Sequence, residues 1–191
     1  MPELRSPLEG HAAPGGAGPL TLGERAPGGL IQIAGWPDSF ADAAGAALAP
    51  LGFAGLGDFR LARVAAAITA FRIAPERIWL TSADGSRLAE FAATLDPAVT
   101  PVLDLGHARW VIRLGGPALE DLLARLVAID VAGGALPVAG FAQTGIEGIG
   151  VLAHRLASGQ VELYVPTTFA LALWDLIRAA AMPFGYGVAA D

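Results

Sequence analysis

The sequence predicts an α+β fold in which helices pack on antiparallel sheets. Short runs of alternating apolar and polar residues are joined by tight turns, and segments with apolar residues at i, i+3, i+4 and i+7 lie between them. The strict alternation of strands and helices that indicates a parallel sheet is absent. The second half of the chain repeats the order of elements of the first half without repeating its sequence. We therefore expect two repeated units of antiparallel strands with packed helices.

The first unit is expected to start with a strand that ends at the turn Gly35-Trp36-Pro37. Ser39, with Asp42 three positions on, has the spacing of a helix start. A short turn at residues 74–76 separates two further strands, and Asp84 begins a second, short helix. The expected strands of this half are residues 30–33, 64–73 and 77–82, and the expected helices are residues 39–51 and 84–95.

In the second unit, Pro117 at a first helical position and acidic residues in the first turn predict a helix. Its leucines follow the i, i+3, i+4, i+7 spacing. A final helix is expected from Thr167, with Phe169, Leu173 and Ile177 on its buried face. The expected strands of this half are residues 102–105, 109–114, 141–146, 150–156 and 160–165.

Residues 1–29 are expected to form an extended N-terminal arm, and residues 30–187 a single α+β domain. Glycine and proline recur from Gly10 to Gly29 without an apolar period. Four leucines interrupt them, too few to fold alone but enough to lie in a groove of a partner (Leu4, Leu8, Leu20 and Leu22). A disordered tail and an arm that becomes ordered on a partner both fit this composition.

The composition excludes several kinds of site. Without cysteine the chain has no disulfide, zinc-thiolate site or thiol nucleophile. All 12 basic residues are arginine, which excludes a Schiff-base lysine and a Walker-type phosphate lysine. The net charge of −6, with no arginine cluster, argues against nucleic-acid binding.

Charged residues make up only 16% of the chain, against about 25% in an average soluble protein. The longest charge-free stretches, residues 43–57 and 131–146, are shorter than the ~20 residues of a membrane-spanning helix and contain proline and glycine. No signal peptide is recognisable near Met1. We therefore expect a cytoplasmic protein, outside the membrane, part of whose surface is buried against partner chains.

Asp104 and His107 are the most prominent polar pair. They flank Leu105-Gly106, where a hairpin bend is expected and where an aspartate can orient an imidazole. Because no nucleophile accompanies them, a structural or interface role is favoured over catalysis or a binding site of another kind. His154 has no second ligand at metal-binding spacing. The four tryptophans are spread over four elements, as core or interface aromatics are (Trp36, Trp79, Trp110 and Trp174).

Several segments resemble the gamma-subunit family of heterotetrameric sarcosine oxidase. Residues 103–107 are similar to its L-D-x-S-H segment and residues 111–117 to its V-I-R-x-x-G-P segment. Residues 72–80 are similar to its R-I-x-P-x-R-x-W hairpin. Further similarity lies at residues 128–131, 141–144 and 165–174. Gly106 stands where the family has serine, and Thr167-Thr168 replaces an arginine–serine pair.

The resemblance implies a fold like the N-terminal part of folate-binding aminomethyltransferases. It also implies a non-catalytic assembly subunit, with alpha, beta and delta subunits as partners, in a complex that oxidises an N-methyl amine such as sarcosine. FAD, FMN, NAD and tetrahydrofolate would be held by the partner subunits and no cofactor by this chain. No catalytic residue is carried over. Asp104, His107, Arg113 and Trp174 are candidate structural or interface residues. A stand-alone folate-binding aminomethyltransferase-like protein is the alternative.

Overall fold

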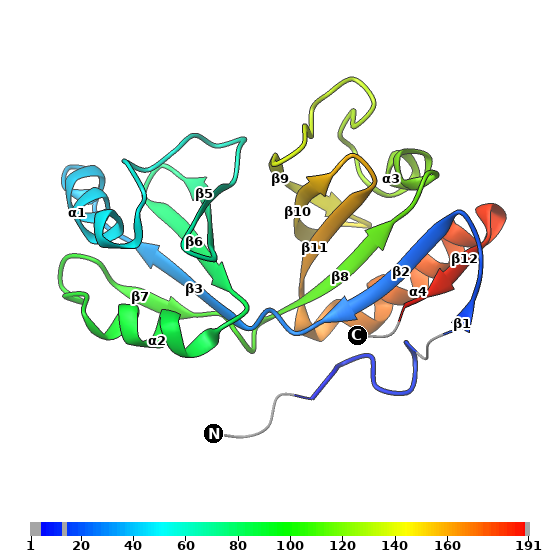
Figure 1. Ribbon diagram of the computed structural model, residues 1–191, viewed down its shortest axis with the longest axis horizontal. Helices are drawn as coiled ribbons and strands as arrows, with labels where there is room; N and C mark the ends of the chain where they lie inside the picture. The colour runs from blue at the N-terminus through cyan, green and yellow to red at the C-terminus, as the bar shows by residue number, and fades with distance from the viewer. Residues whose placement is uncertain (1–4, 13–14, 190–191) are drawn as a thin grey trace. The chain divides into compact units, whose positions relative to one another are not determined.

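The structure is a computed structural model that describes residues 5–12 and 15–189. The chain forms two compact units (Figure 1). The middle unit comprises residues 27–106, and the terminal unit combines residues 1–26 with residues 107–191. The chain therefore leaves the terminal unit after Ala26 and returns to it at His107. No helix among the described residues is long and apolar enough to cross a membrane.

The middle unit is a five-stranded antiparallel sheet with two helices. The sheet order is β4-β5-β6-β3-β7, so β4 and β7 are its edge strands. The helices pack through Phe40, Ala44, Leu48 and Leu88 against apolar residues of the sheet. The elements are β3 (Gly29–Ala34), α1 (Phe40–Leu48), β4 (Arg63–Ala65), β5 (Ile68–Ala74), β6 (Arg77–Ser82), α2 (Gly85–Ala93) and β7 (Val102–Asp104), with a 3-10 turn at Ala49–Leu51.

One predicted strand of this unit is two strands in the structure. Residues 64–73 divide into β4 and β5, which pair as a hairpin through the two-residue turn Ala66-Ala67. Both alanines have positive φ, 48° and 62°. This is the backbone that asparagine and glycine usually signal in two-residue hairpins. With alanine at both positions, the sequence shows no turn.

The terminal unit is a seven-stranded sheet with the order β1-β12-β2-β8-β11-β10-β9. All its pairings are antiparallel except that of β12 with β2. The helix α4 packs on β8 and β11 and contacts α3. The elements are β1 (Gly15–Gly16), β2 (Leu20–Arg25), β8 (Arg109–Gly115), α3 (Leu119–Leu126), β9 (Phe141–Ile146), β10 (Ile149–Ala157), β11 (Gln160–Pro166), α4 (Ala170–Ala181) and β12 (Tyr186–Val188), with 3-10 turns at Thr167–Phe169 and Met182–Phe184.

Alternating residues of the central strands build the core of this unit. On β8, Trp110, Ile112 and Leu114 are buried in one apolar cluster together with Leu122 of α3 and Trp174 of α4. Fully burying each such side chain contributes about 1.5–3 kcal/mol before the loss of conformational entropy. The intervening residues of β8 point to the other face of the sheet, because side chains alternate along a strand.

Residues 20–25 do not form the predicted arm. They are strand β2, which is hydrogen-bonded to β8 on one side and to β12 on the other. Leu8, Leu20 and Leu22 are fully buried in the core of the terminal unit; Leu4 lies outside the described residues. The division into an arm of residues 1–29 and one domain of residues 30–187 therefore differs from the observed units. The partners of β2 lie about 90 and 165 residues further along the chain, so no local pattern reveals them.

The predicted hairpin bend at residues 104–107 is also absent. β7 pairs with β3 in the five-stranded sheet, whereas β8 pairs with β2 and β11 in the seven-stranded sheet. The short segment between them therefore connects two sheets and does not reverse the chain within one.

Candidate functional site

One face of the seven-stranded sheet carries polar side chains, and we call it the polar face. The register aligns Gly23 of β2, Arg113 of β8, Glu162 of β11 and His154 of β10 in one row across four strands. Two residues along, Thr21, Gly115 and Gln160 form the next row. Cross-strand neighbours on one face have Cβ atoms about 4.5–5.5 Å apart, so the side chains of Arg113, Glu162 and His154 are close neighbours, and the two glycines leave space beside them.

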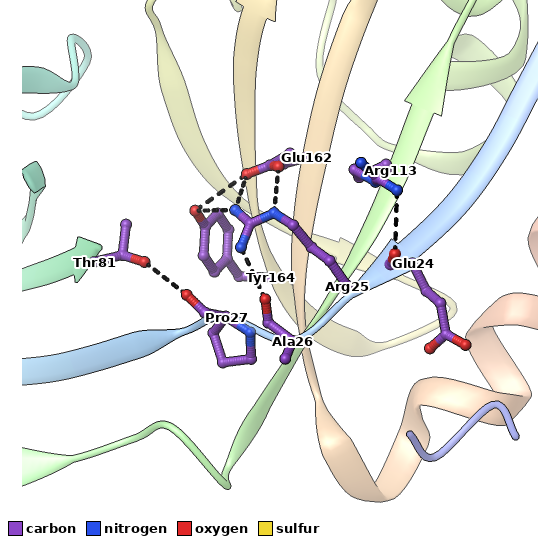
Figure 2. Close-up of polar contacts among 8 residues, drawn as sticks. All are labelled: Glu24, Arg25, Ala26, Pro27, Thr81, Arg113, Glu162 and Tyr164. Atoms are coloured by element: carbon purple, nitrogen blue, oxygen red, sulfur yellow. Dashed lines mark hydrogen bonds and ion pairs between the residues drawn. The ribbon is translucent and has the colours of Figure 1, made fainter. Parts of the chain in front are cut away.

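An ion pair between Arg25 and Glu162 lies at the centre of the polar face (Figure 2). Arg25 Nε donates to Glu162 Oε1 (2.7 Å) and Nη2 donates to Oε2 (2.6 Å), so the pair is bidentate. Tyr164 also donates to Glu162 Oε2 (3.2 Å), and Arg25 Nη1 donates to the backbone oxygen of Ala26 (2.9 Å). The Glu162 side chain is 8% exposed and the Arg25 side chain 28%. The dense hydrogen bonding compensates for the removal of both charges from water.

The environment shifts two pKa values on this face. Burial lowers the pKa of Arg25, but the hydrogen bonds and charge of Glu162 outweigh it, so the pKa is raised and the charge is retained. Burial also lowers the pKa of His154; the charge of Glu162 opposes this shift and the charge of Arg25 adds to it. His154 is therefore held neutral at a pH where an exposed imidazole would be partly protonated.

Arg113 lies beside this pair and crosses strand β2. Its Nη2 donates to the backbone oxygen of Glu24 at 3.4 Å (Figure 2). A Cβ at Gly23 would stand 3.5 Å from both Nε and Nη2 of Arg113. The absence of a side chain at Gly23 thus leaves room for the guanidinium to lie over the strand.

A pocket of about 400 Å³ opens on the polar face, entirely within the terminal unit. We call it the polar pocket. Its outer residues Thr21, Leu156 and Gln160 are exposed, whereas Gly23 and Glu162 are buried. The remaining lining residues include Arg113 and three further glycines (Arg113, Leu114, Gly115, Gly116, Gly159, Val161 and Ala189).

The predicted residues Asp104 and His107 are both exposed. Asp104 Oδ1 accepts a hydrogen bond from Gly106 N (2.8 Å), and the backbone oxygen of His107 accepts one from Thr167 Oγ1 (2.9 Å). The boundary between the two units falls between Gly106 and His107. The pair therefore flanks the connection between the units, and its interface role stays a prediction.

Trp174 packs in the core of the terminal unit and binds the N-terminal segment. It is fully buried in α4, and its Nε1 donates to the backbone oxygen of His11 (3.2 Å). The second anchor of the N-terminal segment is Glu24, whose Oε2 accepts from both Ser6 Oγ and Trp110 Nε1 at 2.5 Å. Trp174 directly, and Trp110 through Glu24, thus hold residues 6–11 against the rest of the terminal unit.

Sequence reasoning singled out Arg113 but missed Arg25, Glu162 and Tyr164. Glu162 and Tyr164 alternate with the apolar residues Val161, Leu163 and Val165 of β11, and the sequence gives them no partner. Arg25 belongs to the segment interpreted as an arm. The polar residues that alternate along β11 were the available signal. Only the pairing of β11 with β8, and of β8 with β2, brings them close to Arg25 and Arg113. Among residues 5–12 and 15–189, no three histidine, aspartate or glutamate side chains gather as a metal site.

No protein-family model and no curated protein matches the sequence. Among solved structures, the chain is similar to a chain of the heterotetrameric sarcosine oxidase from Corynebacterium sp. U-96, solved in complex with pyrrole 2-carboxylate. The TM-score is 0.78 at 23% identity, over 94% of this chain and 95% of that one.

The chain is also similar to the glycine cleavage system aminomethyltransferase T from Bartonella henselae. The TM-score is 0.57 at 18% identity, over 92% of this chain but only 57% of the transferase. The predicted α+β, aminomethyltransferase-like architecture is thereby confirmed. The chain has the fold of a heterotetrameric sarcosine oxidase chain, an aminomethyltransferase-like fold.

Proposed function

We propose that the chain is a non-catalytic assembly subunit of a sarcosine oxidase-like complex that oxidises an N-methyl amine. The observation that carries this proposal is the structural match along nearly the whole of both chains, 94% and 95%. Subunits resembling alpha, beta and delta chains would be its partners. Those partners would hold FAD, FMN, NAD and tetrahydrofolate, and this chain would hold none of them.

The polar groups of the terminal unit support a structural role. The Arg25–Glu162 pair is saturated by hydrogen bonds, and the buried Arg155 donates to Glu120, to the backbone oxygen of Leu136 and to that of Ser158. Catalytic acids and bases need access to a substrate and a pKa near the working pH. Arginines bound to carboxylates and backbone oxygens meet neither requirement.

Exposed apolar residues beside an edge strand support a role in assembly. Phe59, Leu61 and Val64 lie within six residues at and before β4 and are 47%, 44% and 70% exposed. Edge strands carry unpaired backbone groups that another chain can bind, and large exposed apolar groups favour burial in an interface. The low charge content of the chain agrees with such an interface.

Co-purification tests this proposal. The full chain, with an affinity tag, is expressed together with candidate alpha, beta and delta subunits. We expect a stoichiometric complex with flavin absorbance and N-methyl amine oxidase activity, and a colourless chain when it is expressed alone. Oxidase subunits that assemble and turn over equally well without the chain would contradict the assembly role.

A stand-alone folate-binding aminomethyltransferase-like protein is the second candidate, and the similarity to the transferase favours it. Two observations weigh against it. The chain spans only 57% of the transferase, and none of the residues lining the polar pocket carries an aromatic ring that could stack on a pterin. Titration of the isolated chain with a reduced folate separates the candidates: tight, stoichiometric binding would replace the assembly proposal.

A further inference from the structure

We propose that the open edge of strand β4 in the middle unit binds an extended, acidic segment of a partner subunit, which adds a strand to the five-stranded sheet. This inference rests on the proposed assembly role and names the way in which the chain contacts its partner. Three observations support it: backbone groups that point away from the sheet, apolar side chains held exposed beside them, and a local excess of arginine.

The backbone of β4 offers a hydrogen-bonding edge. Among the described strands, β4 pairs with β5 alone. The two strands meet in a two-residue turn, so Ala65 and Ile68 form the hydrogen-bonded pair that closes the hairpin. Pairs alternate along an antiparallel ladder, which makes Val64 and Thr69 a pair without mutual hydrogen bonds. The N–H and C=O of Val64 therefore point away from β5, where another strand can bind them.

The segment before β4 is ordered although its apolar side chains are exposed. Phe59 is 47% exposed and Leu61 44%. Asp58 Oδ1 accepts hydrogen bonds from the backbone N–H of Arg60 (2.8 Å) and of Leu61 (2.7 Å). The guanidinium carbon of Arg72 lies 4.6 Å from the centre of the Phe59 ring. An apolar surface that is already held in place loses little conformational entropy when a partner covers it.

The charge of this surface indicates the chemistry of the partner segment. Residues 55–72 contain three of the 12 arginines of the chain but only one of its 18 acidic residues. Arg60 is exposed and Arg63 lies on β4 itself. A segment that carries aspartate or glutamate beside apolar residues would match these charges, and cross-strand pairs of opposite charge are stabilising. A second copy of this chain would bring an equally basic surface to the edge, so the charge favours a different chain.

Hydrogen–deuterium exchange at the Val64 amide tests the added strand directly. The full chain is compared free and in the complex purified with candidate alpha, beta and delta subunits. We expect the Val64 amide to exchange at least tenfold more slowly in the complex, because a hydrogen-bonded amide exchanges only when its structure opens. The Ile68 amide, which is bonded within the hairpin in both states, is the internal reference.

The outcomes of this measurement separate the inference from the assembly role. If the complex forms and the Val64 amide exchanges as fast as in the free chain, the added strand is overturned and the assembly role stands. If no complex forms, both are overturned.

A proline at position 64 tests the same hydrogen bond by a different route. Val64→Pro removes an N–H that makes no bond to β5, and proline is tolerated at such positions of edge strands. We expect unchanged thermal melting and at least a tenfold loss of affinity for the partner subunits, because a carbonyl of the partner strand loses its donor. Val64→Thr keeps the N–H and a β-branched side chain, so this matched control should retain wild-type affinity.

A charge reversal tests the acidic character of the partner. Arg60→Glu should weaken affinity at least tenfold at low salt, and the loss should shrink as ionic strength rises. Arg87→Glu is the control, since it makes the same change at an exposed position of α2 in the same unit. The proposal is overturned if Val64→Pro folds and assembles like wild type, or if Arg60→Glu and Arg87→Glu have the same affinity for the partner subunits.

Discussion

At the scale of single residues, the Arg25–Glu162 pair is the most sensitive point of the terminal unit. Substitution Glu162→Gln keeps the shape of the side chain but leaves the guanidinium of Arg25, which is 28% exposed, without its counter-charge. Breaking a buried pair from one side costs about 3–5 kcal/mol, and the partial exposure of Arg25 favours the lower end. We expect a loss of about 3 kcal/mol in the free energy of unfolding, measured by urea denaturation.

The control for this change is Asp175→Asn. Asp175 and Arg178 form a surface pair at 3.7 Å with side chains 58% and 40% exposed. Such pairs contribute about 0–1 kcal/mol. If Glu162→Gln and Asp175→Asn lower the free energy of unfolding by equal, small amounts, the Arg25–Glu162 pair is not a major source of stability.

His154 should make stability depend on pH. Burial lowers its pKa in the folded chain below the ordinary value of 6.5, so below that pH the unfolded chain binds more protons than the folded chain. Stability contributed by neutral His154 is therefore present above pH 6.5 and is lost as the pH falls through the lowered pKa. Denaturation of wild type and His154→Gln at about pH 7.5 and about pH 5.5 should show a smaller pH dependence in the variant. If the free energy of unfolding depends on pH equally in wild type and in His154→Gln, groups other than His154 cause that dependence.

At the scale of elements, strand β2 carries the largest difference between prediction and structure. Leu22 is fully buried in the core, and its neighbour Thr21 lies on the polar face and is exposed. Leu22→Ala should lower the free energy of unfolding by about 2–5 kcal/mol, because it removes apolar contact and leaves a cavity. Thr21→Ala should change it by less than about 0.5 kcal/mol. If thermal and urea denaturation show equal, small losses of stability for both variants, residues 20–25 are not part of the core.

The elements that sequence patterns predicted well are those with local signals. Strands β6 and β9 have the predicted bounds, and α3 follows from its four leucines, all of which are buried. Asp84 caps α2 by accepting from Ser86 N, whereas Ser39 makes no side-chain cap at α1. β1 and β12 were missed because they are only two and three residues long and contain glycine. β2 was missed because it lies among glycines and prolines and because its pairing with β12 joins the two ends of the chain.

At the scale of the whole molecule, the assembly role predicts a surface that matters only in the complex. Val64→Glu places a charge on the edge strand β4, where the valine is 70% exposed. We expect unchanged melting of the isolated chain and at least a tenfold loss of affinity for the partner subunits, because a buried unpaired charge is costly. Affinity is measured by co-purification and by titration of the variant chain against the partner subunits.

Ala46→Glu is the control for this prediction, since it adds the same charge at an exposed position of α1 in the same unit. It should leave assembly unchanged. Two variants that assemble alike, either both normally or both poorly, would show that the β4 edge has no specific part in the interface.

The sequence by itself determined the α+β class, most helices and strands, and the absence of cysteine and lysine chemistry, because periodicity and composition are local properties. The tertiary structure decided that the first 26 residues belong to the terminal unit and that residues 104–107 connect two sheets. It also decided that Arg25, Arg113, Glu162 and His154 meet on one face. These features depend on pairings between strands up to about 165 residues apart. Such pairings are selected by burial of the whole core and not by any pattern within a single strand.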